Sequence, residues 1–177
     1  MKKVIRLSES DLVKLVKKII LETEPEESEA SKSGEWQDVL DSAYSQVDKV
    51  PYKWAGMTPD GKSGEGFDCS GFVKWTFKDA GKFNNENGEL DNEKYNKFPR
   101  TAQGQYDNSQ KVEDIQIGDL VFFTHGSGVQ HVGIISQVYD TDFSMVHSSS
   151  SQGVTELNNV TANDYWGHRI VGFGRYN

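Results

Sequence analysis

The stretch GFDCSGFVKW contains the only cysteine of the sequence, Cys69, between an acidic residue and a serine. Asp68 is a residue type that caps helices, so the pattern predicts a helix beginning at Cys69. The sulfur would then lie beside unpaired backbone N–H groups at the positive end of the helix dipole, which favours the thiolate. Gly66 and Gly71 would leave room for a substrate backbone, and the Cys69 N–H could help to hold an oxyanion. A lone cysteine is also commonly an inert buried residue, so this stretch alone leaves both interpretations open.

A cysteine nucleophile needs a base, and the sequence offers His125, His131, His147 and His168. We interpret His125, in a glycine-flanked loop, and His168, just before the last predicted strand, as non-catalytic. The chain has no histidine pair at helical spacing with a neighbouring carboxylate and no second cysteine. The sequence therefore predicts no metal site.

His131 and His147 lie in two successive predicted strands that a short turn at residues 139–142 separates. If these strands pair as a hairpin, residues whose numbers sum to about 280 lie opposite each other, and the two histidines are about one diagonal step apart. This predicts His131 as the base for Cys69 and His147 as the residue that fixes its tautomer. Either histidine alone would be interpreted as a half-buried strand residue.

The elements that must position these residues are helical first and then mostly β. Helices are predicted at residues 36–47 and from Cys69 to a left-handed Gly81, whereas residues 82–98 have few apolar anchors and indicate a surface excursion. Strands are predicted at residues 119–124, 131–138, 143–148 and 169–175. This order predicts an α+β domain with helices on one side of an antiparallel sheet.

The N-terminal region has a different composition from the rest. Residues 1–21 are predicted to hold an amphipathic helix, and the acidic, serine-rich residues 22–34 a flexible linker before one domain at 35–177. The helix could dock on its own domain or a sister chain, on a larger assembly, or on a membrane surface. Its lysines interrupt any apolar centre, so no signal peptide is readable.

The bulk composition excludes several classes of protein. The 177 residues suffice for one packed domain, and the formal net charge of −8 argues against nucleic-acid binding. No apolar run approaches the roughly 20 residues of a membrane-spanning helix. A single cysteine also rules out an intramolecular disulfide, so packing must supply the stability.

Seven ordered blocks resemble the NlpC family of papain-like cysteine peptidases, which cut bacterial cell-wall peptides. The blocks are PYKWAGMTP, GFDCSGFVKWTFKDAG, FPRTAQGQY, IQIGDLVFF, HVGIISQV, MVHSSSSQGV and YWGHRIVGFGR. The resemblance covers about residues 36–176 and implies a papain-like fold with the nucleophile at a helix N-terminus. It also implies Cys69 as nucleophile, His131 as base and His147 as the third, polar residue of the triad.

The resemblance further implies three substrate contacts. Tyr52 resembles the family's tyrosine beside the thiol, and Asp68 and Ser70 resemble the pair that contacts the free amino end of short wall peptides. The implied reaction is hydrolysis of an amide bond in a peptidoglycan stem peptide, most often between γ-D-glutamate and the diamino acid, without a cofactor. The alternatives are an N-acetylmuramoyl-L-alanine amidase and a virion structural or assembly protein that retains the fold.

Two departures from the family bear on specificity and origin. The loop at residues 58–66 and the excursion at 82–98 are longer than is usual for the family, and both flank the predicted Cys69 helix. The segment RLSESDLVKLVKKII resembles the N-terminal segments of some phage-encoded proteins. It would suit a lysis or virion-borne enzyme that reaches the bacterial wall by another route.

Overall fold

A computed structural model describes residues 27–59 and 65–176, with side chains described from Trp36 onward. The chain divides into two compact units, residues 1–35 and 36–177. The amphipathic helix predicted within residues 1–21 lies outside the described residues. The second unit contains all the described strands and all the described side chains.

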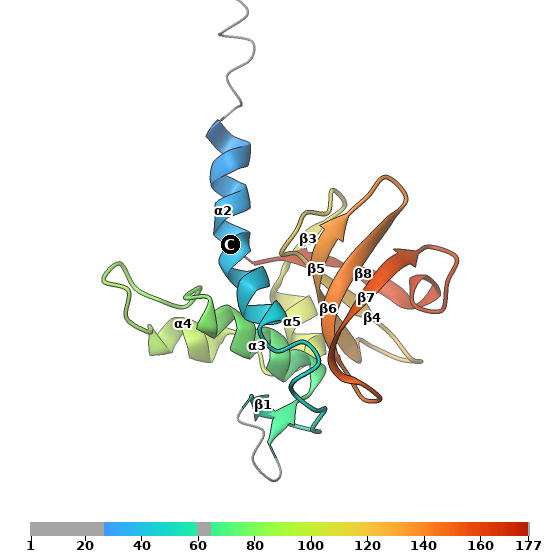
Figure 1. Cartoon of the computed structure of the whole chain (residues 1–177), viewed down its shortest axis with the longest axis horizontal. Coiled ribbons are helices and arrows are strands. Elements are labelled where there is room, and N and C mark those ends of the chain that lie inside the picture. The colour runs from blue at the N-terminus through green and yellow to red at the C-terminus, as the bar shows by residue number, and fades with distance from the viewer. Residues whose placement is uncertain (1–26, 60–64, 177) are drawn as a thin grey trace, which may run out of the picture. The chain divides into compact units, whose positions relative to one another are not determined.

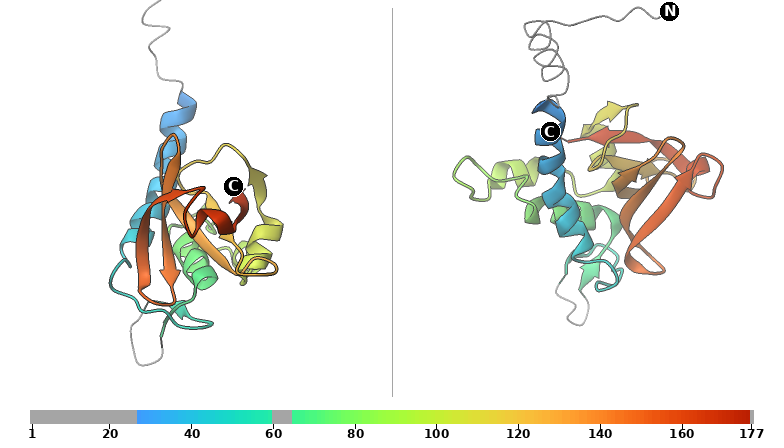
Figure 2. Two further views of the ribbon diagram at one scale, coloured as in Figure 1. Left: turned by 90° about the vertical axis from the view of Figure 1, so that its right-hand side faces the viewer. Right: turned by 45° about the horizontal axis from the view of Figure 1, so that its top comes forward.

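The centre of the unit is a six-stranded antiparallel sheet in the order β3-β8-β4-β5-β6-β7 (Figures 1 and 2). The strands are β3 Gln110–Val112, β4 Leu120–Phe123, β5 His131–Val138, β6 Asp142–Ser149, β7 Gly153–Thr161 and β8 Ile170–Arg175. Two short strands, β1 Met57–Thr58 and β2 Gly66–Phe67, pair separately beside the sheet. The four strands predicted from the sequence are thus confirmed.

The β5–β6 hairpin has the predicted register. Ile134 lies opposite Val146 and Ile135 opposite Met145, and the Tyr139 N–H donates to the Asp142 carbonyl across the turn. The register shifts only toward the turn, after Ile135. The position of the predicted turn at residues 139–142 was therefore sufficient to predict their pairing.

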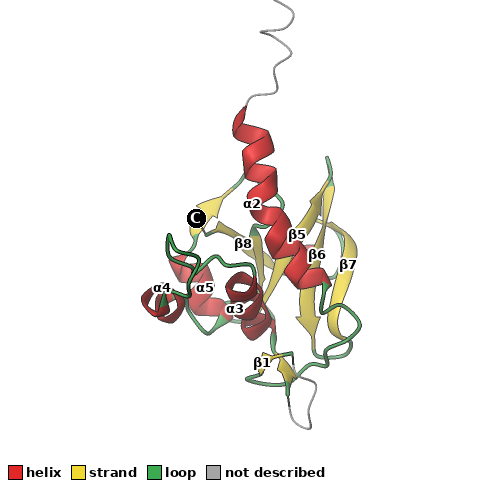
Figure 3. Ribbon diagram, turned by 60° about the vertical axis from the view of Figure 1, so that its left-hand side comes forward, coloured by secondary structure: helices red, strands yellow, loops and turns green. Residues whose placement is uncertain are grey.

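The helices lie on one side of the sheet, as expected for the predicted α+β class (Figure 3). They are α2 Glu27–Tyr44, α3 Cys69–Asp79, α4 Asn92–Lys97 and α5 Ala102–Asn108, followed later by a short 3-10 helix at Gly167–Arg169. Helix α3 ends near Gly81, whose φ of 74° is the left-handed conformation predicted for it. None of the described helices is long and apolar enough to cross a membrane.

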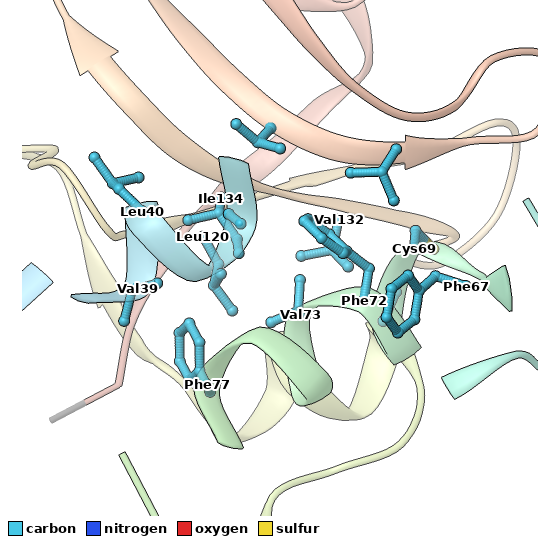
Figure 4. Packing of buried hydrophobic residues seen from close by; sticks show 14 of the residues in the cluster. Val39, Leu40, Phe67, Cys69, Phe72, Val73, Phe77, Leu120, Val132 and Ile134 are labelled. Carbon is cyan, nitrogen blue, oxygen red and sulfur yellow. The ribbon is translucent and has the colours of Figure 1, made fainter. Parts of the chain in front are cut away.

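Each face of the sheet has its own apolar core. On the helix side, Phe72, Val73 and Phe77 of α3 pack with Leu120 and Ile134 of the strands (Figure 4). On the opposite face lies a second, smaller cluster, made of Val121, Phe123, Ile135, Phe143, Met145 and Val160. Successive strand residues point to opposite faces, which explains why β4 and β5 contribute to both clusters.

Three sequence predictions need correction. Helix α2 begins at Glu27, so residues 27–34 are helical instead of irregular; glutamate, alanine and lysine have good helix propensity, and the serines do not prevent it. The excursion at 82–98 is anchored after all, because Phe83 and Phe98 are buried in the helix-side core. Strand β7 was missed because its centre, TELNN, lacks the apolar alternation that indicates a strand.

Candidate active site

The predicted start of α3 is confirmed. The Asp68 carboxylate accepts a 2.7 Å hydrogen bond from the Gly71 N–H and so caps the helix at Cys69. The glycines have a different role from the predicted one. A Cβ on Gly71 would lie 2.1 Å from the Gly56 carbonyl oxygen, and one on Gly66 would lie 2.4 Å from that of Pro51. These glycines therefore make room for the chain's own backbone, not for a substrate.

Cys69 lies against the edge of β5, at the residues that flank His131. Its thiol donates to the Gln130 carbonyl, with the sulfur 3.8 Å from the oxygen, and the Val132 N–H interacts with the sulfur. Strand β5 pairs with β6 only from Ile134 onward, so on this edge the first residues of β5 can contact the start of α3. The tertiary fold thus brings residue 69 next to residue 131.

The two predicted histidines are in direct contact. His131 Nε2 lies 2.7 Å from His147 Nδ1, and the two side chains are almost fully buried. A Cβ on Gly133 would lie 2.6 Å from Met145 Sδ, so a larger residue there would displace the Met145 side chain. The antiparallel pairing of β5 with β6 brings the two imidazoles together, as the register predicted.

An indole covers the histidine pair. The Trp166 ring lies 5.2 Å from that of His131 and 5.3 Å from that of His147, centroid to centroid, and it also contacts Phe123. Asp164 fixes this segment, since one carboxylate oxygen accepts from the Trp166 and Gly167 N–H groups and the other from the Thr161 N–H. These bonds lower the pKa of Asp164 although burial opposes them.

Burial controls the protonation of the three groups. It raises the pKa of the Cys69 thiol to about 11, with a further rise from Asp68, and it outweighs the backbone N–H groups that favour the thiolate. Burial likewise lowers the pKa of His131 to about 3 and of His147 to about 4. The pKa of the thiol is therefore raised, whereas the helix dipole alone predicted a lowered one. Thiol and imidazoles are all neutral near pH 7.

Two cavities meet at Cys69. The first, which we call the Trp54 cavity, has a volume of about 660 Å³ and is lined by residues that include Tyr52, Trp54, Asp68, Cys69, Ser70, Arg100, Gln103 and Gln130. The second, the Trp166 cavity, has about 380 Å³ and is lined by residues that include Tyr52, Cys69, His131, Ser149, Ser151, Tyr165 and Trp166. Tyr52, Cys69, His125 and Gln130 line both. The thiol therefore lies between two cavities. This position suits a nucleophile that attacks a bond in the middle of a long substrate.

Arg100 links the residues that the sequence singled out for substrate contact. Its guanidinium donates to both carboxylate oxygens of Asp68, at 2.9 and 2.7 Å, and to Ser70 Oγ at 3.0 Å. It also donates to the Gly56 carbonyl at 3.3 Å. Bidentate arginine–carboxylate pairs are the strongest and most directional ion pairs in proteins. Asp68 therefore already has a cationic partner before any substrate arrives.

Within the described residues, no group of three or more His, Cys, Asp or Glu side chains could hold a metal ion. The functional groups of the site are thus a thiol, two imidazoles, a phenol and an arginine–aspartate pair. A thiol beside a base of this kind is suited to nucleophilic attack on a carbonyl carbon.

The family of the chain is shown by comparison with known proteins. Residues 49–175 match the model of the NlpC/P60 family, so the chain belongs to that family. A similar chain, named "Probable endopeptidase p60", occurs in Listeria monocytogenes and is 35% identical over 126 residues, which cover 70% of this chain and 21% of that protein. This chain thus spans about a fifth of that relative's length.

Two further relatives agree with this assignment. The gamma-DL-glutamyl hydrolase of Bacillus subtilis is 30% identical over 136 residues, which cover 76% of this chain and 27% of that one. A solved structure of an NlpC/P60 family protein from Bacillus cereus has 26% identity and a TM-score of 0.57, covering 80% of this chain and 40% of that chain. The predicted NlpC-type fold is therefore confirmed.

Sequence reasoning missed Arg100, Trp54 and Trp166 as site residues. All three stand in sequence blocks that carried the family resemblance, FPRTAQGQY, PYKWAGMTP and YWGHRIVGFGR. Nothing in their local sequence says that they meet at Cys69, because each comes from a different loop or helix start. His125, which we interpreted as non-catalytic, also lines both cavities.

Proposed function

We propose that this chain is a cysteine peptidase that hydrolyses an amide bond in peptidoglycan stem peptides. The observation that supports this most is the contact between His131 and His147, 2.7 Å apart, together with the cavity that His131 and Cys69 both line. A chain of the NlpC/P60 family with this arrangement has a nucleophile, a base and an orienting residue.

His131 acts as the base. Its Nε2 faces His147, which leaves Nδ1 for the proton of the thiol. His147 accepts the Nε2–H and so holds His131 in the tautomer whose Nδ1 is unprotonated. Because the Cys69 thiol and the His131 imidazole are both neutral near pH 7, the proton moves from the sulfur to Nδ1 as the sulfur attacks the substrate carbonyl carbon.

The remaining steps follow from this proton position. The tetrahedral oxyanion is stabilised by backbone N–H groups at the start of α3, among them that of Cys69. His131 returns the proton to the leaving amine as the C–N bond breaks, which leaves an acyl-enzyme. Water then attacks the thioester with His131 again as base, which releases the acid and restores the thiol. Tyr52, beside the thiol in both cavities, contributes to shaping this site.

The bond that we propose is the one between γ-D-glutamate and the diamino acid. The support is the family and its relative named gamma-DL-glutamyl hydrolase. The alternative bond, between muramic acid and L-alanine, would make the chain an amidase. The two differ in the mass of the released fragment.

The test is to incubate purified wall fragments with the protein and to determine the products by mass spectrometry. We expect a new amino terminus at the diamino acid, and no product with Cys69→Ala. Undiminished cleavage by Cys69→Ala, or no new stem-peptide terminus with the wild type, would refute the proposal. As a matched control, a thiol alkylator should abolish the activity and a metal chelator should leave it intact.

A further inference from the structure

We infer that the Trp54 cavity binds a sugar ring of the wall glycan, with Trp54 as the stacking platform. This inference rests on the proposed function and names its substrate class: stem peptides that are still attached to the glycan. The juxtaposition that carries it is an exposed indole, a neutralised carboxylate and the nucleophile around one cavity.

The indole of Trp54 faces solvent. Trp54 is 81% exposed, the largest fraction of any described large hydrophobic residue, although it lines the same cavity as Cys69. An exposed indole carries a free-energy cost because a large apolar area faces water. A tryptophan at the rim of a ligand cavity is typical of a binding contact.

The backbone turn that carries Trp54 is strained and is held by its neighbours. Trp54 lies in a turn closed by the Gly56 N–H and the Lys53 carbonyl at 2.9 Å, in which Ala55 has a φ of 60°. A non-glycine residue in this conformation is strained. The turn is fixed from outside, since the Gly56 carbonyl accepts from Arg100 and from the Asp68 N–H at 3.2 Å. Strain held by surrounding contacts is typical of functional sites.

The charge of the Trp54 cavity is set by the ion pair of Asp68 and Arg100. Asp68 would be the natural partner of a free substrate ammonium, yet Arg100 already occupies both of its oxygens and Ser70 Oγ. Gln103 is engaged with Asp107 and the Val129 N–H, and Gln130 Oε1 accepts from the His125 N–H. The groups that line the cavity for a ligand are therefore neutral or cationic, such as the Tyr52 hydroxyl, the Gln130 amide N–H and the edge of the Arg100 guanidinium. This set fits hydroxyl, amide and carboxylate groups better than an amino terminus.

The exposed indole favours a ligand that has an apolar face. A stem peptide consists of alanine, glutamate and a diamino acid, none of which offers a large apolar surface to an indole. The C–H face of a pyranose ring does, and its hydroxyl and acetamido groups can bond polar side chains that line the cavity with Trp54. The cavity volume of about 660 Å³ is within the range of sites for small ligands. In peptidoglycan the complementary ligand is therefore a sugar of the glycan strand.

The experiment compares one stem tetrapeptide in two forms, free and attached to the N-acetylglucosamine–N-acetylmuramic acid disaccharide. For the wild type we expect kcat/KM to be about tenfold higher with the disaccharide form. Trp54→Ala should bring the ratio of kcat/KM between the two forms close to one, whereas Trp54→Phe should retain most of the preference. Tyr139→Ala is the matched control, because Tyr139 is 52% exposed on the β5–β6 turn, outside both cavities.

Equal cleavage of the two forms by the wild type would overturn the inference. So would a Trp54→Ala variant that loses activity on both forms alike, since Trp54 would then act through the turn. If the wild type cleaves neither form, the proposed function fails instead. Calorimetric titration of Cys69→Ala with the disaccharide tetrapeptide still decides the inference. Adding Trp54→Ala must weaken binding at least about tenfold. The inference is refuted if Cys69→Ala alone shows no detectable binding, or if adding Trp54→Ala leaves its binding unchanged.

Discussion

On one side of Cys69 the indole of Trp166 packs against both histidines, and on the other side the indole of Trp54 is 81% exposed. The Trp166 side holds neutral imidazoles whose pKa values burial lowers to about 3 and 4. The Trp54 side holds an arginine–aspartate pair and an open cavity. The same residue type thus excludes water from the reacting groups on one side and offers a surface to a ligand on the other. We expect substitutions on the first side to change the chemical step and substitutions on the second to change substrate preference.

The sharpest test of this contrast is His131→Ala. We expect kcat for cleavage of the stem peptide to fall by about 10³-fold, because the base that deprotonates the thiol is lost. KM should change little, since His131 lies on the Trp166 side, away from the proposed sugar site. Steady-state kinetics on a defined muropeptide measure both, and a rise in KM with unchanged kcat would contradict the assignment.

His147 should matter less, since it acts through His131. We expect His147→Ala to lower kcat by about 10²-fold and His147→Asn to restore part of it, because the asparagine carbonyl can accept the His131 Nε2–H. The alanine and asparagine variants also need equal thermal stability for this comparison. Equal activity of the two variants would argue that the hydrogen bond to His131 has no catalytic role.

Trp166→Ala should change the pH profile. Burial keeps the pKa of His131 near 3, so the base is unprotonated over the whole range above about pH 5. Admitting water raises this pKa toward the ordinary value, about 6.5, so the acid limb of the kcat profile moves to higher pH. We expect up to about fourfold lower activity at pH 6 from this cause, and almost no loss at pH 8. Trp166→Phe is the matched control, and an acid limb that stays in place would show that Trp166 does not set the pKa.

Arg100→Lys should have the smallest effect. Lysine keeps the charge but cannot bond both oxygens of Asp68, and the pair is partly exposed, so we expect the free energy of unfolding in urea to fall by about 1 kcal/mol. Lys97→Ala is the matched control: it removes an exposed pair with Glu93 on α4 and should leave stability unchanged. A larger loss for Lys97→Ala than for Arg100→Lys would invalidate the distinction between the two pairs.

The sequence by itself determined the start of α3, the β5–β6 register and the pairing of His131 with His147. A helix cap and a hairpin turn are local, so the residues that produce them can be recognised without knowing the fold. The ordered blocks also pointed to the family that the comparison later showed. The catalytic roles remain predictions that the experiments above test.

Only the tertiary structure decided what surrounds the thiol. It placed Cys69 at the edge of β5, paired Arg100 with Asp68, and packed Trp166 on the histidines. These contacts join residues far apart in the chain, and no local pattern encodes them. The protonation of Cys69 shows the reason: the helix start favours the thiolate, but burial depends on the whole fold and prevails, which raises the pKa to about 11.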